Sequence, residues 1–432
     1  MTFSHRAAAA AAVVATAGLL LAGCSSSGSA PADTGTVGGE VTLWSYGKVQ
    51  PSMTALIDGF EKANPGTTVK VIEEPGDQYF ALLRAALTSG QGPDIFQMFP
   101  GGYQHQFSDY SLDLSTYIDR SEFEAVQGQF FAKDSNLDNP VYGVPLVSNM
   151  YYTLYNQEIL DKAGVTEFPT DWAETEAACK KITAAGFLCI GYGSDTGSGG
   201  FDAYQDFSYM SGAAIGLAGW DGLIDGSVKY DSPALVDQVT KWGDLREKGY
   251  TNEDVLTWRD VRTDFLAGKT AMYMTGSWDA SWAADGLGTK VHAAPTPFSD
   301  DPQDVLIRLQ DSGLSVSSDS KNPATAAAFT AYAISPEGQK IIAAAGGVPA
   351  RTGVETDSSI NQEILDRSIA EKWTVMPMID NFLDASVTTA LRSSLNQVMA
   401  GQLTASEALT KVDQATAAVS ANDRVTYNLS GK

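Results

Sequence analysis

Residues 41–99 read VTLWSYGKVQPSMTALIDGFEKANPGTTVKVIEEPGDQYFALLRAALTSGQGPDIFQMF, and this stretch decides the expected fold. Two segments, residues 53–64 and 79–89, carry apolar side chains at the spacing of a helix with one buried face. Short apolar segments flank these helices and predict buried strands at residues 41–46, 69–73 and 94–99. Strands that alternate with helices build a mostly parallel sheet covered by helices, so we expect an α/β fold.

The same alternation continues through the rest of the chain. A helix over residues 171–184 is expected to begin after Thr170, which would act as its N-cap. Further strands are predicted at residues 151–155, 188–192, 270–275 and 313–316. The remaining predicted helices are residues 232–248, two helices that begin at Pro323 and Pro336, and residues 381–400 and 404–420.

The N-terminal segment predicts export from the cell. An apolar run from Ala7 to Leu21 follows Arg6 and ends in small residues before Cys24, which is the layout of a secretory signal over residues 1–23. The run is shorter than the roughly 20 apolar residues that a membrane-spanning helix needs. Residues 25–39 are almost all Ser, Gly, Ala, Pro and Thr, a composition typical of a flexible linker.

Composition narrows the class of function. The chain has a net charge of −24, and removal of residues 1–23, which contain one arginine and no acidic residue, changes this charge to −25. Such a charge argues against binding to nucleic acid or adsorption on anionic lipid. The 3 histidines offer little material for a metal site, so we expect neither a metal nor a cofactor. Just over 390 residues follow the linker, enough for two domains.

The two cysteines after Cys24 predict a disulfide. Cys179 lies late in a predicted helix and Cys189 lies in the strand that follows. An exported compartment permits the bridge, which would stabilise the fold by roughly 2–3 kcal/mol. The alternative is two buried free thiols.

Aromatic residues cluster at the ends of predicted strands. Trp44 and Tyr46 close the first strand, Phe99 and Tyr103 follow the third, and Trp278 follows the strand at 270–275. Ligands of open α/β sheets gather at the carboxyl ends of strands. Sugars expose flat patches of C–H that stack on aromatic rings, so this arrangement favours a carbohydrate cleft. For each single ring, packing in the core is the alternative.

Seven short segments in order resemble the extracellular solute-binding proteins of carbohydrate ABC importers, the group that includes the maltodextrin-binding protein. The resemblance covers essentially all of residues 40–420. Its segments are Val41-Thr-Leu-Trp44, Phe60-Glu-Lys-Ala-Asn-Pro65, Gly92-Pro-Asp-Ile95, Tyr142-Gly-Val-Pro145 before Tyr155-Asn156, Ala267-Gly-Lys-Thr-Ala-Met272 with Gly276-Ser-Trp278, Ser312-Gly-Leu-Ser-Val316 and Gly346-Gly-Val-Pro349.

The resemblance implies a two-lobe periplasmic-binding-protein-like fold with a hinge of crossing segments and a ligand cleft between the lobes. The crossings would lie near 144–148, Asp311 and 348–353. One lobe would be residues 40–146 plus 312–350, and the other 147–311 plus 351–432. By the same resemblance, the chain is a monomer that takes a mono- or oligosaccharide and delivers it to the permease subunits of an ABC importer, and it is not an enzyme.

Leu21-Ala22-Gly23-Cys24 resembles the lipobox of bacterial lipoproteins. This resemblance implies cleavage before Cys24 and lipidation of its thiol. The protein would then be anchored to the outer face of the cytoplasmic membrane, with residues 25–39 as the tether.

The resemblance also implies a set of ligand-binding residues. Trp278 occupies the position of a sugar-stacking tryptophan, and Trp44 belongs to the loop after the first strand. The same loop would supply polar groups from Tyr46 and Lys48. Phe99 and Tyr103 stand where the family usually brings a tryptophan to the cleft. The other implied residues are Asn149 and Asp311 at the crossings, Asp202 and Tyr204 as a carboxylate and a ring, and Trp373 as a C-terminal aromatic.

The sequence is also compatible with two alternative functions. An exported glycoside hydrolase could use paired carboxylates, although the chain lacks G-x-S-x-G and H-E-x-x-H motifs. Gly268-Lys-Thr270 resembles the end of a phosphate-binding loop, but Thr263 stands where the loop needs its first glycine. The same fold could also bind a peptide, a polyamine or an organic anion, because fold does not fix the ligand.

Overall fold

The computed structural model describes residues 35–76, 78–193, 203–255, 261–420, 427, 429 and 430. The expected secretory signal, Cys24 and most of the linker lie outside the described residues, as does Asp202. Within the described ranges, no helix has both the length and the apolar character that crossing a membrane requires.

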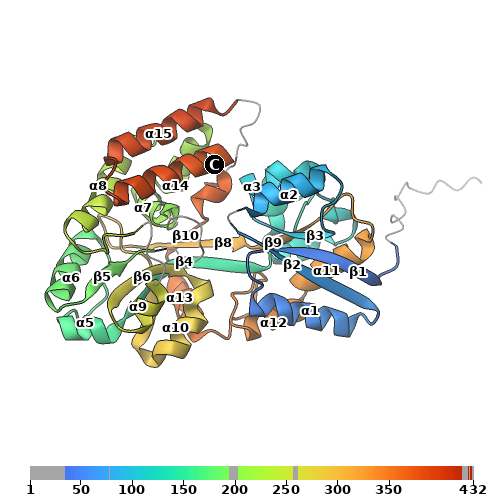
Figure 1. Ribbon diagram of the computed structural model, residues 1–432, viewed down its shortest axis with the longest axis horizontal. Coiled ribbons are helices and arrows are strands. Elements are labelled where there is room, and N and C mark those ends of the chain that lie inside the picture. Colours follow the sequence, from blue (N-terminus) through green and yellow to red (C-terminus); the bar gives the residue numbers. More distant parts are fainter. Residues whose placement is uncertain are drawn as a thin grey trace, which may run out of the picture. The chain divides into compact units, whose positions relative to one another are not determined.

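The first sheet has four strands in the order β2-β1-β3-β9 (Figure 1). β1 (Gly39–Tyr46) pairs in parallel with β2 (Thr67–Glu74) and β3 (Ile95–Met98). β9 (Gly313–Val316), from much later in the chain, pairs antiparallel with β3. The parallel arrangement of the first three strands is the one that the sequence predicts.

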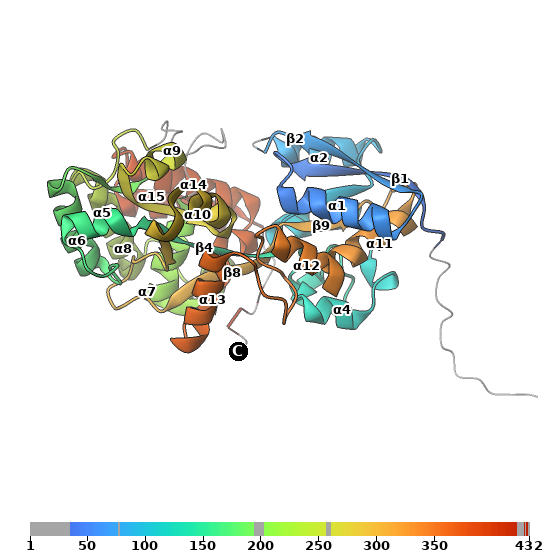
Figure 2. The same ribbon diagram turned by 90° about the horizontal axis from the view of Figure 1, so that it is seen from below.

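Helices cover both faces of this sheet (Figure 1). In α1 (Pro51–Ala63), the buried residues Met53, Leu56, Ile57 and Phe60 recur at helical spacing, which fixes the face that meets the core. The ring of Phe60 lies 5.2 Å from that of Phe329 in α11. The other helices of this half are α2 (Tyr79–Thr88), α3 (Gly102–Phe107), α4 (Arg120–Ala125), α11 (Pro323–Ile334) and α12 (Pro336–Ala344), which lies beside α1 in Figure 2.

The second sheet is built around one long strand, β4 (Val147–Asn156). Its order is β10-β8-β4-β6-β5, with β7 also paired to β4. β4 is antiparallel to β6, β7 and β8, so this half is a mixed sheet and departs from the mostly parallel expectation. The other strands are β5 (Leu188–Gly191), β6 (Thr270–Gly276), β7 (Val291–Ala294), β8 (Val305–Asp311) and β10 (Thr374–Met376).

Two helical layers enclose the second sheet, and each has its own cluster of buried side chains. Figure 1 shows α7 and α14 on one side of the sheet and α9, α10 and α13 on the other. The first layer comprises α5 (Gln157–Ala163), α6 (Trp172–Ala184), α7 (Tyr204–Asp225), α8 (Pro233–Glu247), α14 (Ala385–Met399) and α15 (Ala405–Ala418). The second comprises α9 (Val261–Leu266), α10 (Ala280–Leu287) and α13 (Ser359–Ala370).

The start of α6 corrects one local expectation. Asp171, not Thr170, is the N-cap, and its side chain accepts a hydrogen bond from the Glu174 amide at 2.8 Å. The Thr170 hydroxyl donates instead to the Glu174 carboxylate at 2.9 Å. Thr170 thus supports the cap from one residue outside the helix.

Three segments connect the two halves of the fold. β4 begins at Val147, which pairs with Asp311 at the end of β8 and forms a bridge to Pro349. Figure 1 shows β4 and β8 running from the second sheet toward β9. Buried Gln339 ties two of these segments to α12: its amide donates to the Leu146 carbonyl at 3.0 Å and accepts from the Ala350 amide at 2.7 Å.

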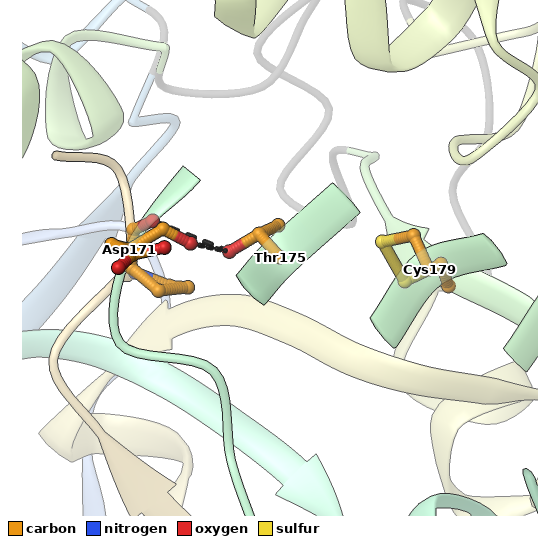
Figure 3. Close-up of a disulfide and its surroundings, with 5 residues drawn as sticks. Asp171, Thr175 and Cys179 are labelled. Carbon is orange, nitrogen blue, oxygen red and sulfur yellow. Dashed lines mark hydrogen bonds between the residues drawn. A yellow bond between two sulfur atoms is a disulfide. The ribbon is translucent and has the colours of Figure 1, made fainter. Parts of the chain in front are cut away.

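Cys179 of α6 and Cys189 of β5 are joined by a disulfide, as the sequence predicts (Figure 3). Both residues are fully buried in the largest hydrophobic cluster. The bridge ties α6 to the strand that ends at Gly191, next to Tyr192.

We expect the Cys179→Ala/Cys189→Ala double variant to unfold with a free energy about 2–3 kcal/mol lower than that of the wild type, because the bridge restricts the unfolded chain. Urea unfolding of both proteins measures the difference. Thiol titration of denatured protein that starts at residue 25 should find no free cysteine. Two free thiols in freshly exported protein would contradict the bridge.

Candidate functional site

A cleft of about 1280 Å³ lies between the two sheets and is lined from both halves of the fold. It opens at the carboxyl ends of β1, β3 and β6, where ligands of α/β proteins gather. The structure brings eight of the sequence-predicted residues to its wall: Tyr46, Lys48, Phe99, Tyr103, Asn149, Tyr204, Trp278 and Asp311.

The wall on the side of the first sheet is aromatic. Tyr46 ends β1, and its ring centroid lies 5.3 Å from that of Phe99, which follows β3. Phe80 of α2 stacks on Tyr103 of α3 with centroids 4.8 Å apart. Because each ring is supported by another, this wall presents a fixed apolar surface.

Trp278 forms the opposite aromatic surface. It lies in a 3-10 turn, η5 (Ser277–Asp279), directly after β6, and its side chain is 40% exposed. The indole meets the Tyr151 ring edge-on, with centroids 5.0 Å apart. A Cβ at Gly276 would lie 2.3 Å from the indole, so only glycine at this position lets the ring fold back over the strand.

The crossing segments place polar groups at the floor of the cleft. Asn149 of β4 donates from its amide to one carboxylate oxygen of Asp311 at 3.2 Å. Asp311 is only 5% exposed, and burial raises the pKa of its carboxyl. Its other oxygen, Oδ1, is shielded from solvent, and the Ser312 backbone amide beside the carboxyl acts to lower its pKa. The Asn149–Asp311 pair is therefore a fixed polar group at the floor of the cleft.

A second buried carboxylate, Asp206, lies at the start of α7. It accepts hydrogen bonds from the Tyr192 hydroxyl at 2.6 Å and the Trp242 indole at 2.9 Å. Burial raises the pKa of Asp206 to about 6, although both hydrogen bonds act to lower it. The Asp206 carboxyl, which lies at the wall of the cleft, therefore gains or loses its proton at about pH 6.

Asp279 is a third buried carboxylate, and it is fully engaged by protein groups. Arg262 pairs with it at 2.5 Å, the Thr275 hydroxyl donates to it at 2.6 Å and the Tyr273 hydroxyl at 3.0 Å. These partners fix the chain directly after Trp278. In the described ranges, no group of three or more His, Cys, Asp or Glu side chains is arranged to hold a metal ion.

Two sequence-predicted residues lie away from the cleft wall. Trp44 pairs with Ile72 and Phe96 within the first sheet, two residues before the end of β1, and its side chain packs on the core of that half. Trp373 is buried beside α13, where its indole donates to the Glu371 carboxylate at 3.0 Å. Asp202 lies outside the described residues.

Other residues of the cleft wall were not singled out from the sequence. Phe80 and Tyr151 lie inside a predicted helix and a predicted strand, where an aromatic residue usually means core packing. Asp206 falls in a region where the sequence predicted no element. The remaining examples are Asp279, Asp380 and Arg392. For Phe80 and Tyr151, proximity to other strand ends was the only available clue, and it requires the topology to be known.

The family model for bacterial extracellular solute-binding proteins matches residues 46–340. A galactooligosaccharide-binding protein of Bacillus subtilis is 22% identical over 424 residues, which cover 96% of each chain. A maltodextrin-binding protein of the same species is 24% identical over 60% of each chain. A binding protein of Brucella abortus is 25% identical over 56% of this chain, and the match spans 58% of that relative's length.

Solved structures share the fold. A chitin oligosaccharide binding protein superposes with a TM-score of 0.76 at 22% identity, covering 88% of this chain and 98% of its own. The GacH receptor of Streptomyces glaucescens, solved unliganded and with acarbose, superposes with a TM-score of 0.73 at 23% identity. The match covers 91% of this chain and 100% of the receptor. A sugar transporter protein of Bacillus licheniformis, solved with stachyose, superposes with a TM-score of 0.69 at 18% identity. The match covers 87% of this chain and 98% of that protein.

We expect Asp206 to make stability depend on pH in a defined direction. The folded protein holds this proton up to a pKa of about 6, whereas the ordinary value is 3.8. Between these values the folded state binds more protons, so its stability is greatest below 3.8 and falls as pH rises through about 6. The contribution is at most about 3 kcal/mol.

The Asp206→Asn variant keeps the shape of the side chain but removes the carboxyl that titrates. Urea unfolding of wild type and variant between about pH 4 and 7.5 isolates the group from the other carboxylates. The free energy of the wild type relative to the variant should rise as pH falls from 7 to 4. A constant difference across this range would show that Asp206 is not buried as a neutral acid.

Proposed function

The chain belongs to the family of bacterial extracellular solute-binding proteins, and from this we propose that it captures a sugar in its cleft and delivers it to an ABC importer. The observation that carries the proposal is the pair of aromatic surfaces, Trp278 on one half and the Tyr46–Phe99 pair on the other. Sugar rings have apolar faces and polar rims. Aromatic surfaces over a polar floor match that chemistry.

The size of the cleft favours more than one sugar ring. Its volume of about 1280 Å³ exceeds the roughly 300–1,000 Å³ that pockets for small ligands usually have. The named relatives and solved structures bind galactooligosaccharide, maltodextrin, chitin oligosaccharide and stachyose. We infer that an oligosaccharide is the ligand of this chain as well.

Each lining residue has a role that follows from its chemistry. Trp278, Phe99 and Tyr103 would stack on sugar rings, and the Tyr204 ring would add a further surface. Asp311, which lines the floor of the cleft beside Asn149, would contribute to the polar surface that sugar hydroxyls meet. Hydroxyl groups would also meet Asn149, the Tyr46 phenol and Lys48, which line the same cleft.

Delivery requires the protein to stay near its importer. We propose that residues 1–23 direct export, that Cys24 is lipidated, and that residues 25–39 tether a monomer to the outer face of the cytoplasmic membrane. The support is the Leu21-Ala22-Gly23-Cys24 sequence, the tether composition and the extracellular family. The importer's permease subunits would be the partner that receives the sugar.

A thermal-shift screen tests the function, because a ligand that binds the folded state raises stability by RT ln(1 + [L]/Kd). Maltotriose, xylotriose, triacetylchitotriose and stachyose form the panel, with glucose as the single-ring comparison. We expect at least one oligosaccharide to raise the melting temperature more than glucose does. No shift with any sugar, together with a shift by a peptide or polyamine, would refute the proposal. Turnover of chromogenic glycosides would favour the hydrolase instead.

We expect Trp278→Ala to weaken binding of the best oligosaccharide of this panel by about 1–3 kcal/mol, roughly fivefold to 150-fold. The ring is partly exposed, so the fold should survive the change. Trp373→Ala is the matched control: it removes a buried indole that does not line the cleft, and should lower stability with little effect on affinity. Calorimetry that finds equal affinity for wild type and Trp278→Ala would place the sugar elsewhere.

The crossing segments supply a hinge for sugar-driven closure. On one side, Gln339 holds Leu146 and Ala350; on the other, Asn149 holds Asp311. Only two residues separate Leu146 from Asn149, and on the neighbouring segment Ser312 alone separates Asp311 from β9. Its φ of 46° is unusual for a residue with a side chain. We take the lobes as residues 40–146 plus 312–350 and 147–311 plus 351–432. A sugar that contacts both walls stabilises the closed form by its differential affinity.

Small-angle scattering tests closure. The radius of gyration should fall when the wild type is saturated with the best oligosaccharide of the panel. Trp278→Ala at the same sugar concentration is the control, and we expect a smaller change, because fewer molecules are loaded. Identical curves for free and fully loaded wild type would show that binding is not coupled to closure.

A further inference from the structure

The ring of Trp278 is exposed, but the residues on either side of it are buried. Ser277 is 4% exposed and Asp279 is 2% exposed, whereas Trp278 between them is 40% exposed. Asp279 is held by the Arg262, Thr275 and Tyr273 side chains described above. The turn that carries the ring is thus fixed from beneath.

Ser277 is held through both its side chain and its main chain. Its hydroxyl accepts from the Met150 backbone amide and donates to the side-chain oxygen Oδ1 of Asn149, each at 3.2 Å. Its own carbonyl accepts from the side-chain amide of Asn361 at 3.2 Å. Asn361 lies in α13, 84 positions later in the chain, and is 0% exposed.

The orientation of the Asn361 amide is fixed by its two partners. The Ser277 carbonyl can only accept, so the Asn361 nitrogen must face it. The Asn361 oxygen then accepts from the Tyr152 hydroxyl at 2.7 Å. Tyr152 lies in β4 and is fully buried. A continuous set of hydrogen bonds therefore runs from β4 through α13 to the turn that carries Trp278.

We infer that Asn361 is a positioning residue for the sugar site: by holding the Ser277 carbonyl, it fixes the turn that presents the Trp278 ring. Asn361 is not among the residues that line the cleft, so its effect on affinity passes through Trp278. This inference rests on the proposed function, because it assigns the ring to sugar stacking. Asn361 would thus contribute to sugar binding although it does not itself touch the sugar.

Asn361→Asp is the sharpest test, because it changes one contact and keeps the size of the side chain. When the new carboxyl is ionised, one oxygen still accepts from Tyr152 while the other replaces the donor that faces the Ser277 carbonyl. Burial raises the pKa of such a carboxyl, and its protonated form would donate to that carbonyl. Asn361→Leu, which has no donor, is therefore measured beside it. Asn361 is the third residue of α13 after the Ser358 cap, where the helix dipole offsets part of the cost of burying a negative charge. The change therefore acts on the turn more than on the helix.

The experiment is a double-mutant cycle at about pH 7.5 with Asn361→Asp, Trp278→Ala and the double variant. Calorimetry uses the oligosaccharide of the four-member panel that most stabilises the wild type. We expect Asn361→Asp to weaken binding by about fivefold to tenfold in the wild type, the scale of one buried hydrogen bond. In the Trp278→Ala background, the loss should shrink to less than about twofold, because the ring being positioned is absent.

Two further measurements separate positioning from a general loss of structure. Asn156→Asp is the matched control, since Asn156 is buried in the same half, caps α5 and does not line the cleft; it should leave affinity unchanged. A readout that needs no sugar is tryptophan fluorescence. Subtracting the emission of the Asn361→Asp/Trp278→Ala double variant from that of Asn361→Asp leaves the emission of Trp278, and the wild type is treated in the same way with Trp278→Ala. This difference isolates Trp278, whose quenching by acrylamide should exceed that in the wild type.

An equal loss of affinity in both backgrounds, or no loss in either, would overturn the inference while leaving sugar binding intact. Failure of every panel sugar to bind the wild type, together with binding of a peptide or polyamine, would instead refute the proposed function. The emission measurement still decides whether Asn361 holds the turn in that case. If Asn361→Asp does not fold, Tyr152→Phe removes only the hydroxyl that orients the Asn361 amide. The same cycle with that variant should show a smaller loss that again depends on Trp278.

Discussion

The antiparallel pairing of β4 with β8 is the constraint on which the rest of the molecule depends. These two strands belong to the sheet of one half, and their ends at Val147 and Asp311 lead into the other half. The pairing keeps the crossings side by side, so the two cores cannot drift apart, and the floor of the cleft is backbone-paired strand. Polar side chains at this floor therefore have fixed positions, whereas the two walls belong to separate hydrophobic cores.

Rigidity within each wall comes from different sources. The wall on the first sheet is a group of rings that support one another, and its order follows from aromatic packing around Phe80. The Trp278 wall is a single exposed ring on a turn whose neighbours are anchored by buried hydrogen bonds. Among the aromatic rings, the indole has one described partner, Tyr151, and it is 40% exposed. The polar network beneath it supplies the order that packing supplies on the other side.

The sequence predicted the elements that have a clear period and missed those that do not. The strands of the first sheet and α1 alternate or repeat cleanly, and they appear near their expected bounds. α7 is 22 residues long, is buried on many sides and kinks at Gly216, so it has no single apolar face to detect. β8 carries Arg308 and Gln310 among its apolar residues, which hides its strand pattern. Cleft residues at strand ends were predictable, whereas Asp206 and Asn361 depend on contacts between distant segments.

Trp44 and Tyr46 show where strand-end reasoning reaches its limit. Both lie on the same face of β1. Both are aromatic, so residue type alone predicts equally for each that it lines the cleft. The difference is register: Trp44 is still paired to strands on both sides, so neighbouring side chains cover it, whereas Tyr46 stands at the last pair with β2, beyond the two residues that pair with β3. A shift of two residues, about 7 Å along a strand, separates a ring that packs on the core from one that lines the cleft. The site is thus set by where pairing stops, which a single sequence does not specify.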